Sequence, residues 1–415
     1  MPKVTAFKAI RPNKEVADKF CALPYDVYNR KESVEIVKEN PLSFLGIDRA
    51  ETSFDDSVDT YAPIVYQKAK ELLEGRINDG TLIQDEKSCF YIYELTMNGR
   101  AQTGIVACSS VDDYVNGIIK KHENTREEKE IDRINHVDTT NAHTGPIFLV
   151  HRTNAQLKEI VSQVKEDVSS LLYDFTSEDE IRHRAFIVNN EDMVKKIESI
   201  FADIPCTYIA DGHHRCASAV KVGLKRRNEN PNYTGEEGFN RFLSVLFPED
   251  ELMIMPYNRV LKDLNGMSVD EFLAACNKAG FTTEEAGDRV SPDKKATFGM
   301  YLNKRWYLLK ASENIMSDDP VKGLDVSILQ DNLLGPVLGI EDPRTDKRID
   351  FVGGIRGLGE LEKRCNEDCV LAFSMFPTSI SELLSVADAG LLMPPKSTWF
   401  EPKLRSGMFI HSLDD

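Results

Sequence analysis

The segment IADGHHR, residues 209–215, brings together side chains that suit an anionic ligand. It continues the β-prone run TY and precedes CASAV, a run of small residues, so we predict a strand, a glycine turn and a helix. The first amides of a helix lack partners within the helix and carry partial positive charge, so they bind phosphate or carboxylate. Arg215 adds a bidentate donor. We therefore expect a phosphate-binding turn, with Asp211 as the residue that caps the helix.

A second polar cluster, KKHENTREEKEIDR at residues 120–133, follows the apolar stretch VNGII. A run with this charge density is often a solvated helix. His122 and Glu123 open the run at the end of a strand or turn, where a carboxylate can act as a general base or hold a metal. Glu123 is therefore the candidate catalytic base, and Asp26, in the turn LPYDVY, is the alternative carboxylate.

The segment MPPKSTWFEPK, residues 393–403, is the third cluster. Two prolines stiffen the approach to Lys396 and Ser397, and a lysine beside hydroxyl groups suits phosphate. The aromatic pair that follows is equally consistent with a C-terminal segment that packs onto the body of the protein. Ser43 and Arg49, in NPLSFLGIDRAE, lie near another turn and are more typical of structural residues.

The elements that would position these clusters alternate irregularly between strands and helices. We expect helices at 31–39, 63–74, 154–174, 326–337 and 380–388, and hairpins around Asn98-Gly99 and at 296–311. This order predicts an α/β fold, an α+β arrangement around a mixed sheet, with an additional α+β subdomain. We place soft boundaries that give regions 1–115, 116–260 with the DGHHR motif, and 261–415. The glycine-rich stretch at 353–360 lacks the lysine of a P-loop and is predicted to be a loop.

The whole chain has 415 residues and a formal net charge of −17. A field of this sign disfavours nucleic acid and anionic lipid as partners. No apolar run approaches the ~18–20 residues of a membrane span, and the N-terminus lacks the apolar core of a signal peptide. Eight scattered cysteines suit reduced thiols. We therefore expect a cytoplasmic protein with small-molecule ligands, and we leave a homodimer open.

The predicted strand, DGHHR turn and helix, followed by FNRFLSVLF, resemble the core of the ParB/sulfiredoxin-like superfamily, in which a short Gly-x-His-Arg motif begins a helix and holds nucleotide phosphates. The whole chain more closely resembles a large bacterial and archaeal family of unknown function, through LPYDV, NPLSFLGIDRAE, KHENT, KEIDR, IADGHHR, MPYNRV and MPPKSTWFEPKLRSGM. Related enzymes that carry Asp-Gly-His-His or a similar motif are free L-serine kinases. The resemblance therefore implies formation of O-phosphoserine. Sulfiredoxin chemistry is not implied, because His213 stands where that family has its cysteine.

Together these features predict a small-molecule kinase that transfers a phosphoryl group from ATP or ADP to the hydroxyl of free L-serine. We assign catalysis to Glu123, Asp211 and His214, nucleotide phosphates to Gly212, His213, His214, Arg215 and Lys396, and the substrate to His122, Asp26 and Ser397. Asp211 would also hold Mg²⁺, which takes one or two carboxylates and keeps several waters. One alternative is a non-catalytic nucleotide-binding switch of the ParB type. Another is a metal-dependent phosphohydrolase, although adjacent ligands in one turn are awkward for a single ion.

Overall fold

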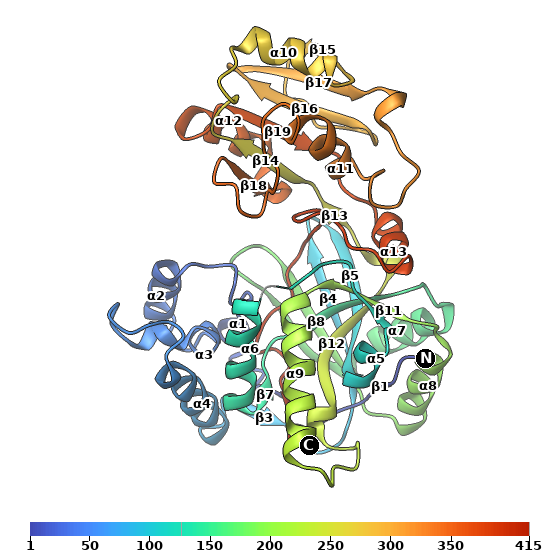
Figure 1. The fold of residues 1–415 in the computed structure, drawn as a ribbon. Coiled ribbons are helices and arrows are strands. Elements are labelled where there is room, and N and C mark those ends of the chain that lie inside the picture. Colours follow the sequence, from blue (N-terminus) through green and yellow to red (C-terminus); the bar gives the residue numbers. More distant parts are fainter. Residues whose placement is uncertain (126, 415) are drawn as a thin grey trace. The chain divides into compact units, whose positions relative to one another are not determined.

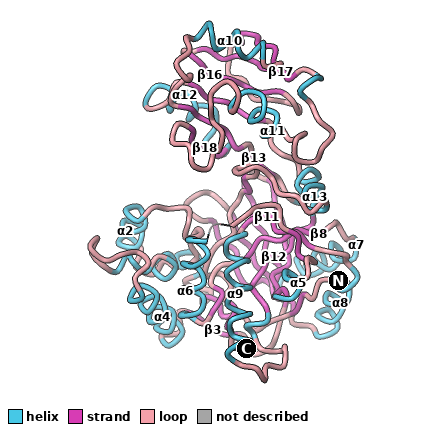
Figure 2. Tube along the Cα trace, viewed as in Figure 1, coloured by secondary structure: helices cyan, strands magenta, loops and turns pink. Residues whose placement is uncertain are grey.

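The structure is a computed structural model that describes residues 1–125 and 127–414. Contacts between residues divide the chain into two compact units, both drawn in Figures 1 and 2. Unit 1 comprises Met1–Leu252 and Pro402–Asp415, and unit 2 comprises Met253–Glu401. The chain therefore returns to unit 1 after it has formed unit 2. The division into 1–115, 116–260 and 261–415 stays a prediction, and the two units are described separately below.

Unit 1 is built on a sheet with nine strands among its described residues. Their order is β6 (Ile119–Lys120), β11 (Thr207–Asp211), β8 (Ile147–His151), β12 (Arg241–Pro248), β5 (Arg100–Ser110), β4 (Phe90–Met97), β10 (Arg182–Val188) and β9 (Leu171–Thr176), with β1 (Val4–Thr5) paired to β5. The pairs β11–β6 and β12–β8 are parallel, and the other pairs are antiparallel. The predicted α/β fold with a mixed sheet is confirmed.

The apolar core of unit 1 lies between one face of this sheet and three helices. Alternate residues of β4, Phe90 and Ile92, belong to this core, as the two-residue period of a strand requires. The helices α7 (Ala155–Glu166), α8 (Glu191–Asp203) and α9 (His213–Glu229) supply its other side. Tyr91 and Tyr93 point to the opposite face, where Phe409 of the C-terminal segment packs against both rings. The sheet is therefore covered on both faces.

The remaining elements of unit 1 are helices and short ladders. They are α1 (Ala17–Phe20), α2 (Arg30–Glu39), α3 (Leu45–Asp48), α4 (Pro63–Asn78), α5 (Val111–Val115), α6 (Glu127–Thr140), the pair β2 (Ile10–Pro12) and β3 (Leu82–Gln84), and the pair β7 (Ala142–His143) and β21 (His411–Ser412). Local signals set two of the starts: Asn29 and Glu32 form a capping box at α2, and Pro63 occupies the first turn of α4. The helices predicted at 31–39 and 63–74 are confirmed.

The helix predicted at 154–174 is wrong beyond its first half. Helix α7 ends at Glu166, and Asp167 accepts a hydrogen bond from the Ser169 amide in the turn that follows. The next residues form β9, which pairs with β10 from Thr176 to Leu171. The apolar pattern in this stretch fits a strand as well as a helix, and pairing with a neighbouring strand decided between them.

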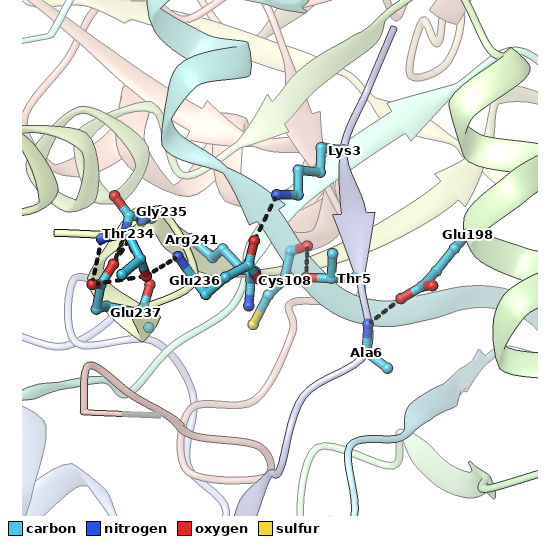
Figure 3. A network of polar contacts seen from close by, with 12 residues as sticks. Lys3, Thr5, Ala6, Cys108, Glu198, Thr234, Gly235, Glu236, Glu237 and Arg241 are labelled. Carbon is cyan, nitrogen blue, oxygen red and sulfur yellow. Dashed lines mark hydrogen bonds and ion pairs between the residues drawn. The ribbon is translucent and has the colours of Figure 1, made fainter. Parts of the chain in front are cut away.

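The hairpin between β4 and β5 turns at Asn98 and Gly99, as predicted. Both residues have positive φ, 51° and 78°, which is the requirement of a type I′ turn. At the far end of β5, the N-terminal strand β1 pairs antiparallel with Ser109 and Cys108. Figure 3 shows the polar contacts around this strand, where Glu236 bridges Lys3 and Arg241. These contacts tie the N-terminus to the loop before β12.

Helix α9, which carries the DGHHR motif at its start, packs closely against α6. The Ser218 hydroxyl donates a hydrogen bond to the Glu130 carbonyl, and the Lys221 ammonium pairs with the Glu130 carboxylate. Farther along, Asp138 of α6 pairs with Lys225 and Arg226 of α9. The part of the charged run from Glu127 onward therefore forms a helix, α6, that supports the motif.

Unit 2 contains a separate antiparallel sheet. Its order is β15 (Phe281–Ala286), β17 (Arg305–Ala311), β16 (Thr297–Leu302), β19 (Leu371–Met375), β14 (Tyr257–Leu261) and β18 (Ile349–Gly353), and β13 (Ile254–Met255) pairs with β20 (Trp399–Phe400). The helices are α10 (Val269–Lys278), α11 (Asp325–Leu329), α12 (Gly357–Glu367) and α13 (Ile380–Asp388). The hairpin at 296–311 and the helix at 380–388 are confirmed. The α-helix predicted at 326–337 ends earlier than predicted, at Leu329, and a π-helical turn, Gln330–Leu334, follows it.

The loop predicted at 353–360 is wrong in its second half. A 3₁₀ turn at Gly354–Arg356 leads directly into α12, which begins at Gly357. The helix buries Leu361 in the apolar cluster of unit 2, and this burial outweighs the poor helix propensity of the glycines. Among the described residues of both units, no helix is long and apolar enough to cross a membrane.

Candidate functional site

The DGHHR motif forms the predicted junction between a strand and a helix. Strand β11 ends at Asp211, Gly212 is the N-cap with φ 90°, and α9 begins at His213. Asp211 as the helix cap is wrong, because its Oδ1 accepts only from the adjacent Gly212 amide, at 2.9 Å. The chain turns through a left-handed conformation that glycine adopts without strain, so the cap position falls one residue later. Gly212 has no side chain, so the cap residue itself gives no side-chain hydrogen bond to the first amides of α9.

Asp211 is paired with Lys403, a residue that the sequence interpretation did not assign. The Lys403 Nζ lies 3.1 Å from the Asp211 Oδ2, and the two side chains are 18% and 34% exposed. Burial disfavours the ionised carboxyl, but Lys403 and Arg215 outweigh it and hold the pKa of Asp211 well below its ordinary value. The signal was present in the third cluster, MPPKSTWFEPK, whose second lysine is Lys403. Our interpretation took Lys396 instead.

Arg215 lies between two glycines. Its Nη1 donates a hydrogen bond to the Pro146 carbonyl at 2.6 Å. A Cβ atom at Gly212 would lie 3.1 Å from its Nη2, and one at Gly145 would lie 3.5 Å from its Nη1. The guanidinium therefore occupies space that a side chain at either position would take. A cation next to bare backbone at a helix start is the arrangement in which phosphate oxygens reach both kinds of donor.

His122 and His213 form a buried pair behind the turn. Their rings meet edge to face with centroids 4.5 Å apart. Burial lowers the pKa of His122 to about 4, and burial, together with the His122 ring, lowers the pKa of His213 well below its ordinary value. Both rings are therefore neutral at pH 7. Glu123 lies at the edge of this pair, with its Oε2 3.8 Å from the His213 Nδ1, so the structure brings the predicted base to the motif.

Lys396 and Ser397 belong to unit 2 and are described within it. Lys396 has a positive φ of 58° and is exposed, with its Nζ 5.4 Å from the centroid of the Tyr257 ring. The Ser397 hydroxyl is buried and donates to the Pro394 carbonyl at 2.6 Å. Their assignments to phosphate and to substrate stay predictions. His214, half-buried on the first turn of α9, likewise keeps its predicted role.

Asp26 lies in a cavity of about 230 Å³ in unit 1, which we call the acid–base cavity. Its charged lining residues are Asp26, Asp48, Arg49, Glu51, Lys129, Asp132, Arg133 and His136, with several tyrosines including Tyr25. A narrower cavity of about 30 Å³ shares Tyr25, Asp48, Arg133 and His136 with it and is also lined by Arg215, Gly145 and Ser406. The two cavities thus connect the motif arginine to the LPYDV turn through shared walls.

Arg133 is the central cation of this cavity. Its guanidinium carbon lies 3.9 Å from the centroid of the Tyr25 ring, and its Nε donates to Asp132 at 2.9 Å. Burial disfavours its charge, but Asp132 and Tyr25 raise its pKa above the ordinary value, so it stays protonated. Burial and the charge of Arg133 lower the pKa of neighbouring His136 to about 4. The KEIDR motif carries part of the resemblance to a known family, but its pattern alone assigns Arg133 no role.

The donors for a magnesium ion are carboxylates and phosphate oxygens. Within the part of the chain that the structure describes, no three His, Cys, Asp or Glu side chains are grouped so as to hold a metal by themselves. Mg²⁺ bound to nucleotide phosphates needs only one or two protein carboxylates. The ionised, one-third exposed Asp211 fits that requirement.

Comparison with known proteins assigns a family. The sequence profile described as "protein of unknown function (DUF1015)" matches residues 4–327. The chain belongs to this family. No curated protein matches it.

Several solved structures resemble this DUF1015 chain at low identity. A free serine kinase mutant in complex with AMP is 13% identical, with 72% of this chain and 87% of that chain covered and a TM-score of 0.35. A conserved hypothetical protein from Pyrococcus furiosus is 14% identical, with coverages of 75% and 96% and a TM-score of 0.34. SbnI with a C-terminal truncation, from Staphylococcus aureus, is 11% identical, with coverages of 71% and 82% and a TM-score of 0.38. At this level of similarity, function has to be argued from the site itself.

Proposed function

We propose that this protein is a small-molecule kinase that transfers a phosphoryl group from ATP or ADP to the hydroxyl of free L-serine. The phosphate site is the turn at Asp211–Arg215, and the serine acceptor follows from the resemblance of its DGHHR motif to free serine kinases. The supporting observation is that two cations lie at the glycine turn that opens the long helix α9: Lys403 on Asp211 and Arg215 beside Gly212.

Phosphoryl transfer depends mainly on positioning and on neutralising charge, and this turn has groups for both. Backbone amides at Gly212–His214 and the Arg215 guanidinium would bind phosphate oxygens. Lys403, at 3.1 Å from Asp211, would carry further positive charge to the same place. In this assignment Lys403 is an added candidate phosphate ligand within unit 1, and the neutral His213 lies behind the turn.

The base that accepts the hydroxyl proton would be Glu123. It is half-exposed and lies beside the motif, 3.8 Å from the His213 Nδ1. A buried neutral imidazole next to it sets its position without competing for the proton. Asp211 would hold Mg²⁺ together with the nucleotide phosphates, where the ion neutralises developing charge.

The deciding experiment uses the full chain with Mg²⁺, L-serine and either ATP or ADP. Formation of O-phosphoserine is followed by ³¹P NMR, and nucleotide consumption is followed by chromatography. The expected result is phosphoserine that requires both serine and nucleotide. If folded protein consumes no nucleotide with serine or with a panel of other small hydroxy compounds, the kinase assignment is wrong.

A further inference from the structure

The acid–base cavity carries charges of both signs in near balance. Four acids, Asp26, Asp48, Glu51 and Asp132, face three permanent cations, Arg49, Lys129 and Arg133. A multiply charged phosphate would meet too many carboxylates here. A ligand that itself carries one positive and one negative group would match such walls.

Most of these charges are already paired within the walls. The Arg49 Nε lies 2.7 Å from the Glu51 Oε1. Asp48 accepts a hydrogen bond from the Thr144 hydroxyl at 2.9 Å, and Asp132 accepts one from the Tyr66 hydroxyl at 3.0 Å. These groups form the frame of the cavity and have little capacity left for a ligand.

Of the charges that these contacts leave over, Lys129 is an exposed lysine, and the other two are the opposite charges of Arg133 and Asp26. The Arg133 side chain is only 9% exposed, and its Nε bonds Asp132, whereas its two terminal nitrogens form no hydrogen bond with any described residue. Asp26 is exposed on the LPYDV turn and makes no ion pair or hydrogen bond within the described residues. A buried guanidinium with unused donors favours a bidentate carboxylate partner. Tyr25 stacks on its plane and fixes the direction of those donors.

We propose that the acid–base cavity is the acceptor site and that it recognises a free α-amino acid, with the α-carboxylate on Arg133 and the α-ammonium on Asp26. The volume of about 230 Å³ suits an amino acid with a small side chain. The narrow cavity shares Arg133 and Tyr25 with this site and reaches Arg215, so the ligand hydroxyl would point toward the phosphate turn. The assignment as acceptor rests on the proposed kinase function, whereas amino-acid binding does not.

The test is binding measured by calorimetry on the full chain, with and without ADP and Mg²⁺. The ligands are L-serine, ethanolamine, which lacks the carboxylate, and 3-hydroxypropionate, which lacks the ammonium group. We expect L-serine to bind at least tenfold more tightly than either truncated compound, because each leaves one charge of the cavity unpaired. Equal binding of the three compounds, or no binding of L-serine in either condition, would overturn the proposal.

Variants assign the two ends of the ligand. Arg133→Lys keeps the positive charge but loses the planar pair of N–H donors that binds a carboxylate in bidentate fashion. Asp26→Asn keeps the shape of the side chain but loses its negative charge. Each is expected to weaken L-serine binding at least tenfold, and Asp26→Asn should also reduce the preference for L-serine over 3-hydroxypropionate. Asp18→Asn, an exposed acid on α1 outside the cavity, is the matched control and should leave binding unchanged. Thermal unfolding of every variant separates lost binding from lost folding.

The outcomes distinguish this inference from the proposed function. L-serine binding that depends on Asp26 and Arg133, without any phosphoryl transfer, supports amino-acid recognition by the acid–base cavity and refutes the kinase assignment. The opposite outcome is phosphoryl transfer to serine with an unchanged KM for serine in folded Arg133→Lys and Asp26→Asn. That result refutes the acid–base cavity as the acceptor site and retains the kinase assignment.

Discussion

At the scale of residues, Asp211 is ionised because two cations surround it. Burial alone would raise the pKa of a carboxyl, yet Lys403 and Arg215 together hold the pKa of Asp211 below its ordinary value. A carboxylate kept ionised beside cations can bind a magnesium ion, and the cations beside it can bind phosphate. Lys403 therefore links the C-terminal segment to the chemistry of the turn.

Replacing Lys403 with Met tests this link. The pKa of Asp211 should rise, because burial then acts with one cation fewer, and nucleotide affinity should fall at least tenfold, as expected for loss of a charge-assisted contact. Carbon-detected NMR titration of the Asp211 carboxyl and calorimetry with ADP measure the two effects. Lys8→Met, at an exposed position on the N-terminal segment, is the control. An unchanged pKa together with unchanged affinity would contradict the assignment.

Replacing Glu123 with Gln separates catalysis from binding. If Glu123 is the base, kcat should fall about 10²–10⁴-fold while ADP affinity stays within a factor of about two. A nucleotide-binding switch would be little affected by the same change. Glu128→Gln, at an exposed site on α6, is the control because it has the same chemistry and lies outside the motif. A loss of kcat at saturating serine in Asp26→Asn, together with an unchanged kcat in Glu123→Gln, would move the role of base to Asp26.

At the scale of elements, the start of α9 depends on a glycine in the left-handed region. Gly212→Ala adds backbone strain of about 1–2 kcal/mol and also places a Cβ 3.1 Å from the Arg215 guanidinium. Gly235→Ala is a matched control, because Gly235 has φ 91° and its Cβ would meet nothing within 4 Å. Denaturant unfolding should show similar losses of stability in both variants. Nucleotide binding should fall only in Gly212→Ala, and equal binding in the two would show that Arg215 is not displaced.

The middle of α9 depends on a glycine for a different reason. Alanine is usually better than glycine in a helix by about 1 kcal/mol. At Gly223, however, a Cβ would lie 2.5 Å from the Phe239 carbonyl oxygen, so Gly223→Ala should destabilise the protein by about 1–3 kcal/mol. Gly75→Ala in α4 should stabilise it by about 0.5–1 kcal/mol, because nothing lies within 4 Å of the added carbon. Urea unfolding of both variants checks the opposite signs, and a gain of stability in Gly223→Ala would show that the loop at Phe239 yields.

At the scale of the whole molecule, the two units should respond to pH in opposite directions. All eight histidines lie in unit 1. Burial lowers the pKa of several of them, to about 4 for His122, His136 and His411 and to about 3 for His143 and His183. Between about pH 4 and 6.5 the unfolded chain binds these protons and the folded chain does not. The free energy of unfolding of unit 1 should therefore fall as pH drops from 7 to 5, by about 2 kcal/mol per histidine.

Unit 2 provides the contrast. Burial raises the pKa of Asp325 from 3.8 to about 6, so the folded form binds a proton that the unfolded form has released. Its contribution to the stability of unit 2 is fully present below about pH 4 and is lost as pH rises from about 4 through 6. Both tryptophans, Trp306 and Trp399, lie in unit 2, so their fluorescence reports its unfolding, while hydrogen exchange in β4 and β5 reports unit 1. Parallel shifts of both units with pH would contradict this account.

Local structure near the motif could be predicted because neighbouring residues determine it. The glycine turn between β11 and α9 and the Asn98-Gly99 hairpin follow from backbone preferences and short apolar periods. The end of α7 could not be predicted, since Leu171–Thr176 fits either element until β10 pairs with it. The helix cap predicted at Asp211 lies one residue later, at Gly212, for the same reason: the ends of strands and helices depend on hydrogen bonds with distant parts of the chain.

The sequence by itself determined the α/β fold and a glycine turn that places an aspartate and an arginine at the start of a helix, from which phosphate binding is predicted. Only the tertiary structure decided which charges meet. Asp211 and Lys403 lie 192 positions apart, and Arg133 stacks on Tyr25 in a cavity that α3, α4 and α6 enclose. Such pairs depend on the path of the whole chain, because a side chain's partner is set by which elements pack together, and no local pattern records it.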